Sequence, residues 1–212
     1  MFFKTVFFDF GGVYYSEGFR RGILDIAREV GTDGEDFFRI ATDSVFSTGY
    51  VTGEVPERIF WDKLASETGL QQDLYPRRES ILKAFQPNRE MAALVQEVRH
   101  STPVALLTDQ TNWLYELDGR DAFLSGFDGV ISSYEEGFSK REPEIFRIAC
   151  ARMNIFPEEG IFFDDNPGNV ERAADFGIRS YLFTDAGDAR DVLYSLGLFQ
   201  YPDTGPEGEG AG

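Results

Sequence analysis

The stretch Thr5-Val6-Phe7-Phe8-Asp9-Phe10-Gly11-Gly12-Val13 decides the fold expected for this chain. Residues 5–8 are apolar or β-branched, which predicts a short buried strand. Asp9 follows the end of that strand, and the two glycines allow a tight turn whose backbone comes close to a ligand. Aspartate and glycine are also common in ordinary turns, so this stretch alone leaves both a structural and a reactive interpretation open.

Two later apolar runs end in polar side chains in the same way: 104–107 with Thr108, and 161–163 with Asp164 and Asp165. A third possible strand, 129–133, is followed by a polar loop that contains Lys140. In open parallel α/β sheets, ligands bind outside the carboxyl ends of the strands. The sequence therefore predicts that these polar groups converge on one site.

Strands and helices alternate along most of the chain. Strands are predicted at 4–9, 103–108, 129–133, 160–164 and 179–183, and helices at 88–98, 112–117, 143–153, 167–176 and 188–196. Such alternation favours an α/β fold with a doubly wound parallel sheet. Asn88 is the predicted N-cap of the first of these helices.

The predicted domain organisation rests on a change in the sequence pattern after the first strand, from apolar runs to charged segments with helical periodicity. Residues 15–86 carry many charges and apolar residues at helical spacing, which predicts a helical segment inserted after the first strand. The α/β core is then expected to comprise residues 1–14 and 87–201. Residues 202–212 lack large apolar groups and are predicted to be disordered. Helices that simply cover the sheet are the structural alternative for 15–86.

Composition excludes several classes of function. The formal net charge of −17 argues against nucleic-acid binding, which needs clustered Lys and Arg. With His100 as the single histidine, a histidine-based triad or metal site is not expected. The single Cys150 excludes an internal disulfide and suits a reducing cytoplasm. No apolar run is long enough to span a membrane, and the first strand leaves no room for a signal peptide.

The four polar stretches together resemble the four motifs of the haloacid dehalogenase (HAD) superfamily. The matching segments, in motif order, are Asp9-Phe10-Gly11-Gly12-Val13, Leu106-Leu107-Thr108-Asp109, Gly137-Phe138-Ser139-Lys140-Arg141-Glu142-Pro143-Glu144-Ile145-Phe146, and Phe162-Phe163-Asp164-Asp165-Asn166-Pro167-Gly168-Asn169-Val170. Each motif is weak alone, but their order and spacing make the set specific. The resemblance implies a Rossmann-like core, and it implies that the helical segment at 15–86 is a small cap.

The resemblance also assigns roles to individual residues. Asp9 is expected to be the nucleophile and an Mg²⁺ ligand, and Thr108 and Lys140 are expected to bind the phosphoryl group. The remaining assignments are the amides of Phe10, Gly11 and Gly12 for phosphate, the Gly11 carbonyl, Asp164 and Asp165 for metal, and Asn169 as a supporting residue. Asp165 is the expected direct ligand of the metal, whereas Asp164 either ligates the metal as well or supports one of its ligands. Tyr14, Tyr15 and Phe19 are expected at the mouth of the pocket.

The sequence departs from the family pattern at two positions. Most HAD phosphatases have a general acid–base Asp two residues after the nucleophile, where this chain has Gly11. Without that proton donor, activity is expected to fall steeply as the pKa of the leaving group rises. Arg141 stands where Pro is frequent, which is expected to alter loop stiffness more than charge.

Three functions are compatible with these observations. The leading hypothesis is an Mg²⁺-dependent cytoplasmic phosphatase that hydrolyses a small phosphorylated metabolite through an aspartyl-phosphate. The second is a 2-haloacid dehalogenase, in which Asp9 attacks carbon; the paired acids Asp164 and Asp165 argue against it. The third is a catalytically impaired binding or regulatory module, for which Gly11 is the motivation. The sequence indicates neither the substrate nor the oligomeric state.

Overall fold

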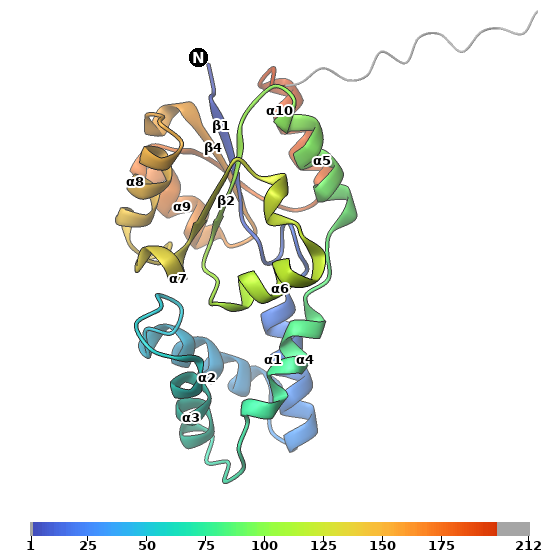
Figure 1. Ribbon diagram of the computed structural model, residues 1–212, viewed down its shortest axis with the longest axis vertical. Helices are drawn as coiled ribbons and strands as arrows, with labels where there is room; N and C mark the ends of the chain where they lie inside the picture. The colour runs from blue at the N-terminus through green and yellow to red at the C-terminus, as the bar shows by residue number, and fades with distance from the viewer. Residues whose placement is uncertain (1, 199–212) are drawn as a thin grey trace, which may run out of the picture.

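The computed structural model describes residues 2–198, in which a five-stranded parallel sheet forms the centre (Figure 1). The strands are β1 (Thr5–Phe8), β2 (Val104–Thr108), β3 (Gly129–Ser132), β4 (Gly160–Asp164) and β5 (Arg179–Leu182), in the order β3-β2-β1-β4-β5. All four strand pairs are parallel. The order reverses at β1, and this is where ligands bind in doubly wound sheets.

Helices cover both faces of the sheet (Figure 1). One face carries α8 (Pro143–Arg152) and α9 (Pro167–Phe176), and the other carries α5 (Arg89–Arg99) and α10 (Ala186–Ser195). Side chains alternate along β1: Phe7 belongs to the core beneath α8 and α9, whereas Val6 and Phe8 belong to the opposite core. Because both faces are buried, the strands read as continuous apolar runs.

Four helices lie together beyond the carboxyl ends of the strands (Figure 1). They are α1 (Gly18–Val30), α2 (Gly34–Ser47), α3 (Glu57–Glu67) and α4 (Arg78–Ala84), with the short 3-10 turn η1 (Tyr75–Arg77) before α4. α6 (Trp113–Asp121) joins this layer to the sheet. The Tyr50 hydroxyl donates to Asn112 Oδ1 at 2.6 Å, and Arg78 bridges Glu57 and Glu116 at 2.8 and 2.6 Å.

Most predicted elements are present with shifted ends. Asn88 caps α5 by accepting a hydrogen bond from the Met91 amide at 3.2 Å, as predicted. α10 begins two residues earlier than expected because the Asp185 side chain caps it by accepting from the Asp188 amide. Three short elements were not predicted: α7 (Ser133–Glu136), η2 (Leu124–Gly126) and η3 (Pro157–Glu159).

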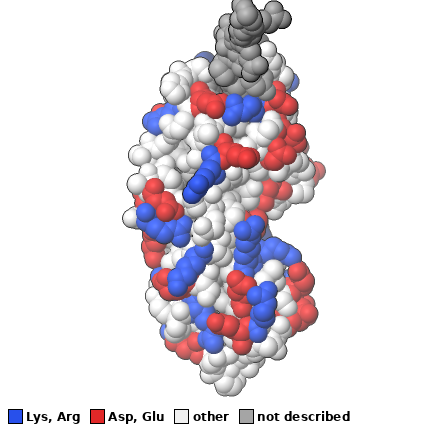
Figure 2. Space-filling model, turned by 90° about the vertical axis from the view of Figure 1, so that its right-hand side faces the viewer, with Lys and Arg blue, Asp and Glu red and all other residues white. Residues whose placement is uncertain are grey.

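The fold class is confirmed, whereas the division into a core and an inserted cap domain stays a prediction. The residues of the expected disordered tail, 202–212, lie outside the described residues. Of the helices that the structure describes, none has both the length and the apolar character needed to cross a bilayer. Figure 2 shows Lys and Arg interspersed with Asp and Glu on one face, so this face presents no continuous basic surface.

Candidate active site

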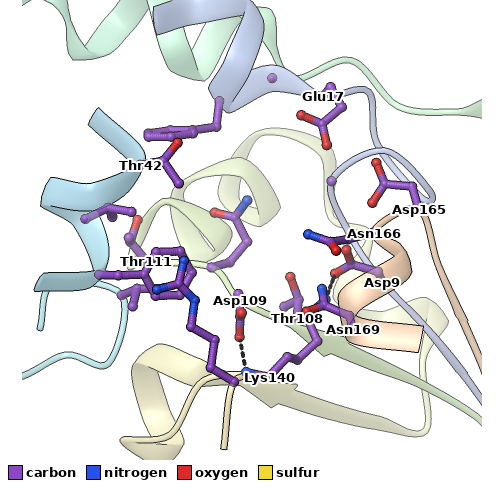
Figure 3. Close-up of a pocket in the computed structure, with 18 of the residues that line it drawn as sticks. Asp9, Glu17, Thr42, Thr108, Asp109, Thr111, Lys140, Asp165, Asn166 and Asn169 are labelled. Carbon is purple, nitrogen blue, oxygen red and sulfur yellow. Dashed lines mark hydrogen bonds and ion pairs between the residues drawn. The ribbon is translucent and has the colours of Figure 1, made fainter. Parts of the chain in front are cut away.

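The carboxyl edge of the sheet brings together the side chains that the sequence predicts for the site (Figure 3). Asp9 follows β1, Thr108 ends β2, and Asp165 follows β4. Together with Lys140 and Asn169, they line a cavity of about 650 Å³ that also reaches α1 and α2. Segments more than 150 residues apart in the chain therefore meet at one cavity because β1 lies between β2 and β4.

Lys140 is the charged centre of this edge and is 1% exposed. Its Nζ lies 2.7 Å from Asp9 Oδ1 and 2.6 Å from Asp164 Oδ2. Burial opposes the ammonium charge, but the carboxylates of Asp164 and Asp9 outweigh it and raise the Lys140 pKa. The lysine therefore stays protonated and is shared between two acids.

The loop that carries Lys140 is fixed by hydrogen bonds on both sides. Glu142 Oε2 accepts from the amide and the hydroxyl of Ser139, each at 2.7 Å. Asp109 accepts from the Lys140 amide at 2.8 Å, and Arg172 donates to the Lys140 carbonyl at 2.8 Å. The sequence predicts no role for Asp109 or Arg172, because their spacing from Lys140 carries no signal for these contacts.

The two adjacent acids have different environments. Asp164 is fully buried and accepts from Lys140, from the Asn166 amide at 2.8 Å, and from Asn169 Nδ2 at 3.1 and 3.0 Å. Asp165 is half-buried and lines the cavity. Asp164 therefore holds Lys140 in place, while Asp165 presents its carboxylate to the cavity. Asn169 lines the cavity as well and orients Asp164 through its amide.

The acidic group at this edge fits a hard divalent cation. One carboxylate oxygen from each of Asp9, Asp164 and Asp165 lies within 4.8 Å of the other two. Oxygen ligands of this kind suit Mg²⁺. Because Asp164 is already occupied by hydrogen-bond donors, Asp9 and Asp165 are the carboxylates best placed to ligate a cation directly.

Burial raises the pKa of two carboxyl groups in the site. It raises the pKa of Asp9 from 3.8 to about 8, with Lys140 opposing and Asp164 and Asp165 adding to the rise. Burial and the neighbouring Glu17 carboxylate raise the pKa of Asp165 from 3.8 to about 7. Both folded values exceed the unfolded ones, so the folded protein binds more protons and loses stability as the pH rises from about 4 to about 8.

This linkage predicts a pH-dependent response to Mg²⁺. A cation that replaces the protons on Asp9 and Asp165 should raise the melting temperature more at about pH 8 than at about pH 5.5. Thermal unfolding in Mg²⁺ and in EDTA across this range measures the difference. The variant Asp165→Asn should reduce it, whereas an equal Mg²⁺ effect at both ends of the range would contradict the assignment.

The turn after β1 places Gly12 against Asp165. Gly12 has φ +80°, and a Cβ added to it would lie 2.0 Å from Asp165 Oδ2. The neighbouring Gly11 lines the cavity and has nothing within 4 Å of an added Cβ. The ring of Phe10 is buried against Tyr15 at a centroid distance of 4.6 Å, so Phe10 offers the site its backbone alone.

We expect Gly12→Ala to destabilise the protein, whereas Gly11→Ala has little effect on stability. A left-handed backbone costs a residue with Cβ about 1 to 3 kcal/mol, and the contact with Asp165 adds to this cost. Urea unfolding of both variants in EDTA measures the difference. A Gly12→Ala variant as stable as Gly11→Ala would show that the turn relaxes freely.

The pocket mouth differs in part from the expectation. Phe19 lines the cavity as predicted, but Tyr14 and Tyr15 are 6% and 1% exposed and do not. Both tyrosines pack against Phe123, at centroid distances of 5.9 and 5.0 Å, because the aromatic core beneath the turn draws them inward. Glu17, which was not predicted, also lines the cavity beside Asp165 (Figure 3).

Comparisons with known proteins agree with this fold. The family model of haloacid dehalogenase-like hydrolases matches residues 3–177. A curated relative, acyl-CoA dehydrogenase family member 10 of Mus musculus, is 27% identical over 191 residues. That match covers 84% of this chain, and the chain spans 18% of the length of the relative.

Two solved structures share the fold. A HAD family enzyme from Bacteroides thetaiotaomicron has a TM-score of 0.70 and 22% identity, with 92% of this chain and 99% of that chain covered. Its complex with magnesium and inorganic phosphate has a TM-score of 0.66, 22% identity and coverages of 86% and 94%.

L-2-haloacid dehalogenase from Xanthobacter autotrophicus, with chloropropionic acid covalently bound, has a TM-score of 0.65 and 18% identity. It covers 91% of this chain and 83% of its own. At these identities the structural likeness establishes the fold, and the family match extends over most of the sequence. The chain therefore belongs to the haloacid dehalogenase-like hydrolases.

Proposed function

We propose that this hydrolase is an Mg²⁺-dependent phosphomonoesterase that acts on a small phosphorylated metabolite through Asp9. The observation that carries the proposal is the position of Asp9. Its carboxylate contacts the buried ammonium of Lys140 and lies close enough to Asp165 for both acids to bind one divalent cation. One ammonium and one divalent cation would together balance the charges of the carboxylates and the phosphate. Helices α1–α4 would form the cap over this centre.

In the first step, an Asp9 carboxylate oxygen attacks phosphorus. A new bond forms between that oxygen and phosphorus, and the bond from phosphorus to the ester oxygen breaks with both electrons on the leaving oxygen. In the second step, water attacks phosphorus, releases inorganic phosphate and restores the Asp9 carboxylate. Lys140 stabilises the charge that develops on the phosphoryl group.

The phosphoryl oxygens would be held by the turn and by β2. The Thr108 hydroxyl lies beside Asp9 in the cavity, where it would donate a hydrogen bond (Figure 3). The amides of Phe10, Gly11 and Gly12 follow Asp9 directly and would donate as an anion-binding nest. Asp164 and Asn169 act through Lys140 and are positioning residues.

A bound Mg²⁺ would supply Lewis-acid stabilisation of the phosphoryl oxygens. Asp9, Asp165 and the Gly11 carbonyl would hold it. The complex of the B. thetaiotaomicron enzyme with magnesium and inorganic phosphate supports this choice of ligand, since that enzyme has the same fold.

Phosphate release from a panel of phosphomonoesters, with Mg²⁺ and with EDTA, tests the proposal. Release that requires Mg²⁺ and depends on Asp9 is the expected result. Because Gly11 leaves no proton donor at that position, aryl phosphates should be turned over faster than alkyl phosphates. Equal turnover of both classes would contradict this part.

A second candidate is haloacid dehalogenation, which the fold of the X. autotrophicus enzyme favours. Asp9 would then attack the carbon that bears the halogen and displace halide. That reaction needs no divalent cation. Chloride release from 2-chloropropionate in EDTA would establish it, and its absence alongside Mg²⁺-dependent phosphate release would exclude it.

A further inference from the structure

Apolar and aromatic side chains, mainly from α1, α2 and α6, form a wall of the cavity: Phe19, Phe38, Val45, Phe46, Val51 and Trp113. The Phe19 ring lies 6.1 Å from that of Phe38 and 6.3 Å from that of Trp113, measured between centroids. Ring edges and faces of this kind favour another ring. A phosphoryl group bound at Asp9 would direct its leaving group toward this wall.

Two polar atoms of the lining residues have no partner. Among the described residues, Thr42 Oγ1 and Trp113 Nε1 are buried and make no hydrogen bond. Trp113 is 1% exposed, and Figure 3 shows Thr42 on α2, across the cavity from Asp165. Buried polar groups are nearly always satisfied, so these two atoms are exceptions among the lining residues, and neither is exposed to the cavity for contact with a ligand.

Arg141 adds a positive charge to the same wall. Its guanidinium carbon lies 3.5 Å from the centroid of the Phe46 ring, and both residues line the cavity. Arg141 forms no ion pair within residues 2–198, and the carboxylate on which its charge acts, Asp109, accepts a hydrogen bond from the Lys140 amide. Arg141 is therefore available to an anionic group, held flat by the ring beneath it.

We propose that this cavity selects phosphomonoesters whose leaving group is an aromatic ring with a second, anionic substituent. The ring would pack among Phe19, Phe38 and Phe46, and its anionic group would pair with Arg141. This inference rests on the proposed function, because it takes the phosphoryl group to lie at Asp9. It makes Phe46 and Arg141 specificity-determining residues.

Direct binding of three non-hydrolysable phosphonates to the wild-type protein in Mg²⁺ tests this inference. The probes are ethylphosphonate, benzylphosphonate and 4-carboxybenzylphosphonate, and calorimetry gives each Kd. We expect benzylphosphonate to bind about tenfold more tightly than ethylphosphonate, because the ring is buried. The carboxylate should add a further factor of about three to ten through Arg141.

Matched variants separate the two contacts. Phe46→Leu should reduce the preference for the ring, whereas Phe156→Leu, an exposed phenylalanine outside the cavity, should not. Arg141→Met should remove the carboxylate effect and keep the ring preference. Arg179→Met is its control, because Arg179 stacks on Phe3 away from the cavity at 5.3 Å.

The outcomes distinguish this inference from the proposed function. Equal affinities for the three probes, together with Mg²⁺-dependent phosphate release, would overturn the inference alone. A carboxylate effect that Arg141→Met leaves unchanged would also overturn it. Absence of both binding and phosphate release would overturn the proposed function and the inference with it.

Discussion

Replacement of Asp9 by Asn is expected to lower Mg²⁺-dependent phosphate release by at least about 10³-fold, because the nucleophilic oxygen is lost. The same change should not destabilise the metal-free protein at about pH 8. Burial and the neighbouring acids oppose the charge of Asp9, and Lys140 keeps its contact with Asp164 at 2.6 Å. Initial rates and thermal unfolding of the same preparation measure both effects.

Asp25→Asn is the matched control. Asp25 is an exposed acid on α1 that pairs with Arg28. Its replacement by Asn should leave the rate of phosphate release unchanged. Activity that survives Asp9→Asn would indicate another nucleophile or a contaminating phosphatase. A large loss of stability in Asp9→Asn would instead mean that the carboxylate contributes to the fold.

Introduction of an acid at Gly11 is expected to raise kcat for alkyl phosphates by about 10²-fold or more, the usual contribution of general acid catalysis. The structure accommodates the change, since nothing lies within 4 Å of an added Cβ and the residue lines the cavity. Its φ lies outside the left-handed range, so a side chain brings no backbone strain. Aryl phosphates should gain less, because their leaving groups need less protonation.

Gly11→Asn provides the comparison, since it adds the same volume without an acidic proton. We expect kcat for alkyl phosphates to rise in Gly11→Asp and not in Gly11→Asn. Equal rates in the two variants would mean that protonation of the leaving group is not limiting. In that case the absence of an acid at Gly11 would not explain a low turnover of alkyl phosphates.

The sequence predicted the fold because its signals are local. The run 160–164 matches β4 at both ends, and Pro167 begins α9 as Pro143 begins α8. Apolar runs, helix-starting prolines and side-chain caps act within a few residues of the chain. The start of α10 differs from the prediction by two residues, because the local cap by Asp185 was not recognised in the sequence.

The site was predicted where a motif carries it and missed where contacts are long-range. Asp9, Thr108 and Lys140 meet at the cavity as expected. No sequence motif predicts the contact of Arg172, because its partner, the Lys140 carbonyl, lies 32 positions away in the chain. Arg141 was expected to affect loop stiffness, yet its guanidinium stacks on Phe46 from another element. Such contacts depend on how distant segments pack against each other, and they cannot be predicted from local patterns in a single sequence.

The central position of β1 also bears on how the chain is made. β1 pairs with β2 on one side and with β4, residues 160–164, on the other. During synthesis at about 5 to 20 residues per second, roughly 8 to 30 seconds separate β1 from its second neighbour. Throughout that interval an apolar strand with an open edge is available for wrong pairing. The nascent chain should therefore need chaperone protection until β4 has emerged from the ribosome.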